Sequence, residues 1–314
     1  MNNKTKILVS GSVAFDQIMN FGGRFKDNIL PEKIHILNVS FFIHQLKESF
    51  GGTAGNIAYN LALLGEKPTL LANVGKDFLP YSKWLNKNRI DQSQLKIDKT
   101  EKTPVAYIIT DKDDNQISGF YPGAIKKPYQ LNQRILNQDC LAIIAPDNPV
   151  NYLNLSKLYR QKKVPYIFDP GQQMASLSGA DLKKSISGAK VFISNDYELS
   201  LALKKMGWKL ETLKKSVEIV VTTLGGKGST IYHQGKKINI PPAKPKNTSD
   251  PTGAGDAYRA GLIKGLVSGW PLEKAGRLAG LVAVYTVEKY GTQTHRFTWS
   301  ELQKRYRQNF GQNL

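Results

Sequence analysis

The chain is poor in cysteine and histidine. It holds a single cysteine, Cys140, which excludes an intramolecular disulfide. Cys140 begins the apolar run at residues 140–144, so we expect a buried thiol without a reactive role. Ordinary surface or core roles are also expected for the four histidines, because none has the spacing of metal ligands. They are His35, His44, His233 and His295. The lack of disulfides predicts a cytoplasmic protein.

Long apolar runs are also missing. No segment reaches the length that is needed to cross a membrane. Residues 1–6 lead directly into the strand-like run at residues 7–9, which is too short for a secretory signal, and no small-residue cleavage site follows it. We therefore expect neither a membrane span nor a secretory leader.

Acidic residues are scarce relative to basic ones. There are 25 Asp and Glu against 44 Lys and Arg, for a formal net charge of +19. Such an excess can indicate nucleic-acid binding. Here the basic residues are scattered, and the densest groups, at 244–246 and 304–307, are short and include only one aromatic residue, Tyr306. We expect a basic surface that favours solubility and attracts small polyanions, and no specific nucleic-acid partner.

Two patterns that are typical of nucleotide-binding enzymes are absent. No G-x4-G-K-[S/T] sequence occurs, which argues against a P-loop mechanism. Neither the glycine-rich loop nor the H-R-D motif of protein kinases occurs either. The sequence therefore disfavours both of these enzyme classes.

Strand-like and helix-like segments alternate along the 314 residues, and 40% of the residues are hydrophobic, which is enough for a sizeable core. We expect strands at 6–10, 69–74, 142–145, 166–169, 191–194 and 219–223, and helices at 53–64 and 81–88. This alternation predicts an α/β fold with a mainly parallel central sheet flanked by helices. Ligands bind such sheets at the carboxyl ends of the strands, where the sequence places Asp147, Asp169, Asn195 and Thr223.

Residues 41–50 and 105–121 break this alternation. Both read as extended chain, and a turn at 111–115 separates 105–110 from 116–121, which is a hairpin pattern. We predict one domain spanning 1–314, with a small β-sheet lid built from segments at about 17–50 and 103–123. An ordinary antiparallel extension of the main sheet is the alternative.

The most informative motif is Asp250-Pro251-Thr252-Gly253-Ala254-Gly255-Asp256, which an apolar helical pattern follows at once. The first amides of a helix lack partners and the helix dipole favours negative charge, so this turn can bind an anion. A carboxylate beside that anion is unfavourable unless it has a chemical role, such as accepting a proton from an attacking hydroxyl. The alternative is a capped helix start in a glycine-rich loop.

A second motif, Gly51-Gly52-Thr53-Ala54-Gly55-Asn56, lies about 200 residues before the first. In order and spacing the two motifs resemble the signatures of the ribokinase-like (PfkB) family of sugar and nucleoside kinases, and the resemblance covers nearly the full chain. It implies a ribokinase-like fold whose small β-sheet acts as a lid, which would exclude water during phosphoryl transfer.

The resemblance also implies ATP-dependent phosphoryl transfer to a hydroxyl group. Asp256 would be the catalytic base. The amides of Gly253, Ala254 and Gly255 would stabilise the charge on the transferred phosphoryl group.

Four residues of the N-terminal part are expected at the acceptor. In the family the position of Asp16 binds sugar hydroxyls, and Gly51, Gly52 and Asn56 would lie against the same sugar. Taken by themselves, Asp16 can be a solvated loop acid, and the other three can form a helix-entry turn with a capping side chain.

Two further motifs are expected at the nucleotide. Asn195 and Glu198 match the N-x-x-E motif that lies near Mg²⁺ and the phosphates in the family, with Glu198 acting directly or through water. They can also form a capping box at a helix start, and the two roles can coexist. Thr223, Gly225 and Gly228 resemble the T-x-G-x-x-G nucleotide loop, although a plain hairpin connection would read the same way.

Asp250, Thr252 and residues 291–293 match places where many family members hold a monovalent cation, so K⁺ is a candidate cofactor. Asp169 can order a phosphate or a metal-bound water, or it can be a turn acid. Edge strands of a lid can pair between subunits, so a homodimer is one arrangement that the sequence allows.

Three features favour a nucleoside acceptor over a free sugar. Residues 51–58, and residues 250–261 together with 290–293, resemble bacterial and archaeal nucleoside kinases. The predicted lid is also aromatic, which suits stacking on a base, although strands bury aromatic residues in any case. Those residues are Phe41, Phe42, Tyr107, Phe120 and Tyr121. Adenosine is the first expectation, followed by other purine nucleosides or cytidine, and then by a sugar. A binding protein without activity is disfavoured because both acids of the 250–256 motif are present.

Overall fold

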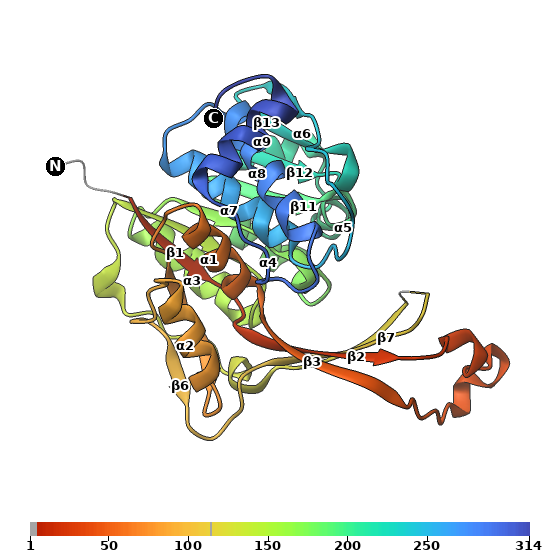
Figure 1. Cartoon of the computed structure of the whole chain (residues 1–314). Coiled ribbons are helices and arrows are strands. Elements are labelled where there is room, and N and C mark those ends of the chain that lie inside the picture. The colour runs from red at the N-terminus through yellow and green to blue at the C-terminus, as the bar shows by residue number, and fades with distance from the viewer. Residues whose placement is uncertain (1–4, 114) are drawn as a thin grey trace.

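The computed structural model describes residues 5–113 and 115–314. Two parts of the sequence predictions lie outside the described residues. They are residues 1–4, which entered the expectation about a secretory leader, and Asp114, which belongs to the expected turn at 111–115. Figure 1 shows a layered α/β body from which a long, narrow sheet projects to one side. Within the described ranges, no helix is long and apolar enough to span a bilayer.

An eight-stranded sheet forms the centre of the body, in the order β14-β13-β12-β11-β10-β9-β1-β4 within the described residues. The strands from β12 to β4 run parallel, and β13 and β14 add an antiparallel hairpin at one edge. The strands are β1 (Lys6–Ser10), β4 (Thr69–Leu71), β9 (Cys140–Ile144), β10 (Tyr166–Phe168), β11 (Val191–Asn195), β12 (Ile219–Thr223), β13 (Ser229–His233) and β14 (Lys236–Ile240). The predicted fold class is confirmed.

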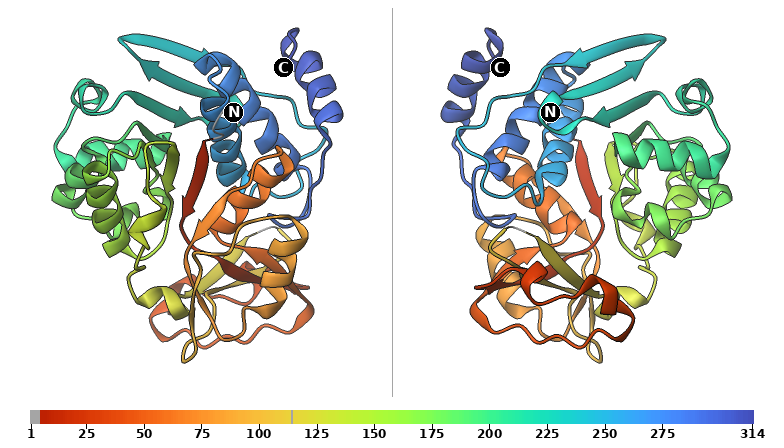
Figure 2. Two further views of the ribbon diagram at one scale, coloured as in Figure 1. Left: turned by 90° about the vertical axis from the view of Figure 1, so that its left-hand side faces the viewer. Right: turned by 90° about the vertical axis from the view of Figure 1, so that its right-hand side faces the viewer.

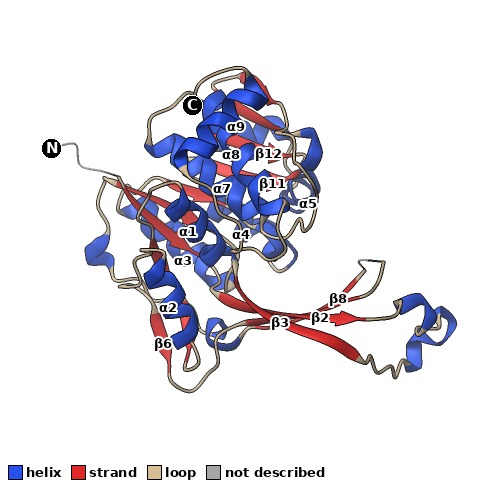
Figure 3. Cartoon of the chain, viewed as in Figure 1, coloured by secondary structure: helices blue, strands red, loops and turns tan. Residues whose placement is uncertain are grey.

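Helices cover both faces of this sheet because its strands alternate their side chains between two apolar clusters. In β1, Ile7 and Val9 belong to one cluster and Leu8 to the other, which also buries Cys140 as expected. The first cluster packs against α1, α2, α7 and α8, the second against α3 to α6, and α9 packs on α8 (Figure 3). The helices are α1 (Thr53–Leu63), α2 (Leu79–Lys87), α3 (Pro149–Gln161), α4 (Gly179–Ile186), α5 (Asp196–Met206), α6 (Leu210–Ser216), α7 (Ala254–Val267), α8 (Leu272–Val287) and α9 (Trp299–Phe310).

Short 3-10 helices occupy several connections: η1 (Phe25–Asp27), η2 (Pro31–Ile36), η3 (Gly123–Lys126), η4 (Gln133–Ile135), η5 (Gly171–Ala175) and η6 (Gly225–Lys227). The single strand expected at 69–74 is wrong. The chain leaves the main sheet after β4, and β5 (Asn73–Gly75) pairs instead with β6 (Lys96–Asp98). An apolar run does not reveal where a strand changes partners, so this break could not be seen in the sequence.

The projection is a separate four-stranded sheet in the order β3-β2-β7-β8. β2 (Ala14–Phe21) pairs antiparallel with β3 (Ile43–Gly51) and parallel with β7 (Val105–Thr110), and β7 forms a hairpin with β8 (Gln116–Tyr121). In both views of Figure 2 this sheet lies at one end of the body and the β13–β14 hairpin at the other. The predicted small sheet is confirmed, and the alternative of an extension of the main sheet is wrong.

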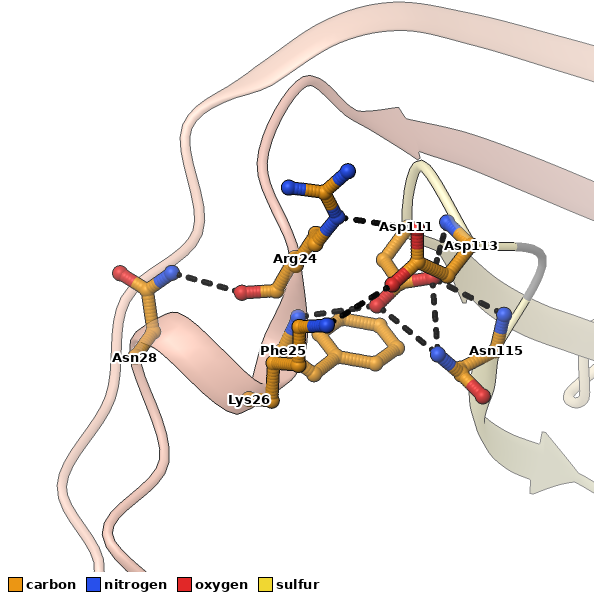
Figure 4. Close-up of polar contacts among 7 residues, drawn as sticks. All are labelled: Arg24, Phe25, Lys26, Asn28, Asp111, Asp113 and Asn115. Carbon is orange, nitrogen blue, oxygen red and sulfur yellow. Dashed lines mark hydrogen bonds and ion pairs between the residues drawn. The ribbon is translucent and has the colours of Figure 1, made fainter.

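At the far end of the small sheet, Asp111 joins the β7–β8 turn to the segment that follows β2 (Figure 4). Its carboxylate accepts hydrogen bonds from the backbone amides of Phe25, Asp113 and Asn115, each at 2.9 Å. Arg24 also pairs with Asp113 at 2.9 Å. These bonds satisfy the amides of an irregular segment and hold η1 against the hairpin.

Helices α7 and α8 approach each other closely because α7 presents glycines at their contact. A Cβ atom added at Gly265 would lie 2.3 Å from the Cβ atom of Ala275, and one added at Gly261 would lie 2.6 Å from the Cα atom of Ala279. A Cβ atom added at Gly280, on α8, would have no other atom within 4 Å. The start of α7, which belongs to the cleft described below, is thus held by a contact that permits only glycine.

We expect Gly265→Ala to lower the free energy of unfolding by about 1–3 kcal/mol, because the helices must separate to admit the methyl group. Gly280→Ala is the matched control and should be neutral or stabilising by about 0.5–1 kcal/mol, since alanine is the better helix former. Thermal and urea unfolding measure both values. Equal stability of the two variants would contradict the close packing of α7 on α8.

Candidate active site

A cleft of about 770 Å³ lies between the carboxyl ends of the parallel strands and the near face of the small sheet. Ligands of open α/β sheets bind at this edge. The start of α7, the loops after β9 to β12 and strands β2, β7 and β8 line the cleft. Most of the residues predicted for the site lie on its walls: Asp16, Gly52, Asn56, Asn195, Glu198, Thr223, Gly225, Thr252, Gly253, Gly255 and Asp256.

Helix α7 begins in the cleft after Gly253, whose φ of +77° favours glycine. Within the described part of the chain, the amides of Gly253 and Gly255 have no hydrogen-bond acceptor. They therefore remain available to an anion at the positive end of the helix dipole. Ala254 differs from the expectation, because its amide donates to the carbonyl of Pro251 at 3.2 Å, and it does not line the cleft.

Asp256 lies in the first turn of α7, and its Oδ2 accepts a hydrogen bond from Nδ2 of Asn56 at 2.8 Å. Burial raises the pKa of this carboxyl group to about 7. Arg259 and the Asn56 hydrogen bond lower the pKa, while the nearby charges of Asp169 and Asp16 raise it. Asp256 is thus a carboxylate poised to exchange a proton near neutral pH.

Asp16 faces the cleft from strand β2, not from a loop as the sequence suggested. Pairing with β3 on one side and β7 on the other buries it, and burial with the charge of Asp250 raises its pKa to about 7. Gly51 lies behind it: a Cβ atom there would be 2.1 Å from Oδ2 of Asp16. Gly51 therefore makes room for Asp16 and does not line the cleft itself.

Arg259 is a residue of the cleft that the sequence reading did not identify. Its guanidinium forms a two-pronged ion pair with Asp169, which follows β10, and the Nη2–Oδ1 distance is 2.6 Å. Both side chains are almost fully buried. The negative charge of Asp169 raises the pKa of Arg259. The sequence suggested Asp169 as a turn acid or as a residue that orders a phosphate or a metal-bound water, and neither suggestion included this ion pair. The signal for it was an arginine in the expected helix, three residues after Asp256.

Asn195 and Glu198 form the capping box of α5, and both line the cleft. The Asn195 side chain accepts from the amide of Glu198 at 2.7 Å, and Oε2 of Glu198 accepts from the amide of Asn195 at 2.9 Å. Burial raises the pKa of Glu198. The capping interpretation is confirmed, and among residues 5–113 and 115–314 no hydrogen-bond donor contacts Oε1 of Glu198.

The 223–228 loop contributes Thr223 and Gly225 to the cleft, but not Gly228. Gly225 has a φ of +56° and open space where a side chain would be. Gly228 closes the turn into β13, because its carbonyl accepts from the amide of Leu224 and a Cβ atom there would lie 2.1 Å from the carbonyl oxygen of Ile240. The connection is therefore a hairpin turn that also borders the cleft.

Asp250 lies in an adjoining cavity of about 1010 Å³ that shares Asp16, Thr252 and Thr292 with the cleft. Its carboxylate accepts hydrogen bonds from the amides of Thr252 at 2.9 Å and Gly291 at 3.0 Å. Both oxygens are thus engaged in joining two loops. No cluster of three or more His, Cys, Asp or Glu that could hold a metal occurs in residues 5–113 and 115–314.

Of the five aromatic residues expected to stack on a base, Phe120 lines the cleft. Phe41 packs on Phe21 and Phe25 instead, and Phe42 is 77% exposed. Tyr121 donates to Glu101 at 2.9 Å, and Tyr107 alternates with the cleft-lining Ala106 and Ile108 and so faces the other side of the sheet. For these four the expected position is wrong: Tyr107 and Tyr121 lie on the other face of the small sheet, and Phe41 and Phe42 precede strand β3.

The comparisons with known proteins agree with this geometry. The family model described as "pfkB family carbohydrate kinase" matches residues 12–298. A nucleoside kinase from Methanocaldococcus jannaschii is 35% identical over 302 residues, which are 96% of each chain. The structure of Burkholderia thailandensis nucleoside kinase in complex with inosine is similar with a TM-score of 0.86 and 35% identity, covering 98% of this chain and 99% of that one.

A ribokinase from Thermotoga maritima, at 20% identity and a TM-score of 0.81, shares the fold over 96% of this chain and 99% of its own. The glycine-rich helix start, the carboxylate of Asp256 beside it and the two-sheet architecture thus occur together in a chain that matches its relatives almost from end to end. The chain belongs to the pfkB family of carbohydrate kinases and is a phosphotransferase that acts on a hydroxyl acceptor.

Proposed function

We propose that the chain is a nucleoside kinase that transfers the γ-phosphoryl group of ATP to the 5′-hydroxyl of a purine nucleoside. The observation that carries this proposal is the position of Asp256, whose pKa is raised to about 7, beside the free amides of Gly253 and Gly255 in one cleft. The relatives named nucleoside kinases, which match nearly the whole chain, support the acceptor class.

Asp256 acts as the base in this proposal. A pKa near neutrality leaves a large fraction of the carboxyl group ionised at pH 7, so it can accept the proton of the attacking hydroxyl. The amides of Gly253 and Gly255 then stabilise the charge on the phosphoryl group in transfer. Most of the rate enhancement comes from this charge stabilisation and from the alignment of the acceptor with the phosphorus atom.

The acceptor lies on the small-sheet side of the cleft in this proposal. Asp16 accepts hydrogen bonds from the two ribose hydroxyls, and Gly52 and Asn56 pack against the same sugar. Phe120 offers an aromatic face to the base, and Gln172 and Gln173 bring amide donors and acceptors to the same cleft. We keep adenosine as the first acceptor and place inosine second, because inosine occupies the Burkholderia enzyme.

The nucleotide lies on the side of β11 and β12, near Asn195, Thr223 and Gly225. The open space at Gly225 and the free amides of α7 fit a nucleotide polyphosphate. Mg²⁺ neutralises phosphate charge when it is bound, and the single free oxygen of Glu198 suits an ion that keeps most of its waters. Four expectations remain predictions: K⁺ binding near Asp250 and Thr252, contact of ligands with Gly51, Ala254 and Gly228, a homodimer, and a cytoplasmic location.

Replacing Asp256 by asparagine should lower kcat by about 10²- to 10⁴-fold, since the variant has no base for the hydroxyl proton. Binding of adenosine and ATP should change little, because the amide occupies the same space. Steady-state kinetics and calorimetric titration measure the two quantities. Asp139→Asn, at the opposite end of β9, is the control and should behave as the wild type. Turnover close to the wild type in Asp256→Asn would overturn the assignment.

Removing the charge of Arg259 should shift the pH dependence. The pKa of Asp256 is lowered by Arg259, so in Arg259→Gln it rises above its value of about 7 and the base stays protonated to higher pH. The acid limb of kcat/KM should therefore move up by about 1–2 pH units. Arg259→Lys keeps the charge, so its acid limb should lie closer to that of the wild type than the limb of Arg259→Gln does. An unchanged limb in Arg259→Gln, with folding verified by circular dichroism, would contradict the role of Arg259.

A panel of acceptors tests the substrate class. ATP consumption should be faster with adenosine and inosine than with cytidine, and slowest with free ribose and fructose, because a free sugar leaves Phe120 without a stacking partner. Comparison of kcat/KM across the five acceptors gives the order. Strong activity on a free sugar alone would show that the protein is a sugar kinase.

A further inference from the structure

A continuous row of buried polar side chains ends at Asp256. Nε1 of Trp84 donates to Oε1 of Gln293 at 2.8 Å, and Nε2 of Gln293 donates to Oδ1 of Asn56 at 3.1 Å. Nδ2 of Asn56 then donates to Oδ2 of Asp256 at 2.8 Å. Nε2 of Gln293 also donates to the hydroxyl of Tyr81 at 2.6 Å. Asn56 and Gln293 are only 4% and 3% exposed, so the middle of the row is buried.

The direction of every bond in this row follows from Trp84. An indole N–H can only donate, so the oxygen of the Gln293 amide must face Trp84 and its NH₂ group must face Asn56. The oxygen of Asn56 must then face Gln293, which turns its own NH₂ group toward Asp256. Tyr81 agrees with this direction, because its hydroxyl donates to the carbonyl of Gly51 at 2.8 Å and so presents only its oxygen to Gln293.

We propose that Gln293 and Trp84 are positioning residues that hold the amide of Asn56 in one orientation and so keep a hydrogen-bond donor on the carboxylate of Asp256. This proposal rests on the proposed function, in which Asp256 is the base. In the reversed orientation the oxygen of Asn56 would face the carboxylate, and two acceptors would then oppose each other. A donor on the carboxylate stabilises its ionised form, which is the form that accepts the proton.

Other charged groups also face Asp256 and have to be separated from this effect. Arg259 approaches it from its own helix, Asp169 from the loop after β10 and Asp16 from β2. None of these groups is hydrogen-bonded to Trp84 or Gln293 within the described residues. The hydrogen-bonded path from either positioning residue to Asp256 runs through Asn56, and a second path from Gln293 runs through Tyr81 to Gly51, which lies against Asp16.

The test uses two neutral substitutions in the full chain. Gln293→Met keeps the approximate volume but removes all three bonds of the amide, and Trp84→Phe removes only the donor that sets the direction of the row. The acid limb of kcat/KM should move up by about 1 pH unit in Gln293→Met and by a smaller amount in Trp84→Phe. Tyr59→Phe is the control: it removes another buried hydrogen bond of α1, to the carbonyl of His295, and should leave the pH profile unchanged.

A double-mutant cycle separates positioning from general loosening of the core. In an Asn56→Ala background, Gln293→Met should add no further shift, because the donor is already absent. A limb that does not move in Gln293→Met, or a shift that persists undiminished without Asn56, would overturn the proposal. An unchanged profile in Trp84→Phe would overturn the role of Trp84.

A carboxyl ¹³C titration of Asp256, assigned by its loss in Asp256→Asn, reads the same pKa without turnover. Its expected result is the same upward shift in Gln293→Met. This readout separates the two hypotheses. If Asp256→Asn retained turnover while the pKa still responded to Gln293, the proposed function would fail and the coupling would stand.

Discussion

The geometry of the cleft depends on the buried ion pair between Arg259 and Asp169. Burial of a single carboxylate is costly, and here Asp16, Asp169 and Asp256 converge on one cleft. Arg259 offsets this accumulation of negative charge, because it pairs with Asp169 directly and lowers the pKa of Asp256 from the same helix. The pair also joins α7 to the loop after β10, so the first turns of the helix are fixed against the carboxyl ends of the strands. Breaking such a pair leaves an uncompensated buried charge.

The main body and the small sheet each contribute one wall of the cleft. The main body supplies the rigid part: the start of α7, the capping box of α5 and the turn after β12, each at the end of a buried strand or helix. The small sheet brings Asp16 and Phe120 to the opposite wall. An acceptor held between these walls would be shielded from water on one side and would face the free amides on the other, which is what phosphoryl transfer to an alcohol requires.

Polar residues far apart in the chain connect these parts. Gln293 follows the 250–256 motif by about 40 residues, yet it lies between Asn56 and Trp84 in the core. Asp250 joins the same late segment to the turn before α7 through the amide of Gly291. The late segment at 291–293 therefore contacts Asp256 indirectly, through Gln293 and Asn56.

Periodicity in the sequence predicted the fold class, the glycine turn predicted the start of α7, and the resemblance to the PfkB family predicted most of the residues that line the cleft. The sequence also predicted both roles of Asn195 and Glu198 without deciding between them. The tertiary structure alone decided that Asp16 belongs to a strand, that Asp169 is paired with Arg259 and that four of the five expected aromatic residues do not line the cleft. These outcomes depend on which distant segments become neighbours. A local pattern carries no information about the partner of a buried charge, the face of a sheet that meets a ligand or the direction of an amide, because each is set by groups far away in the chain.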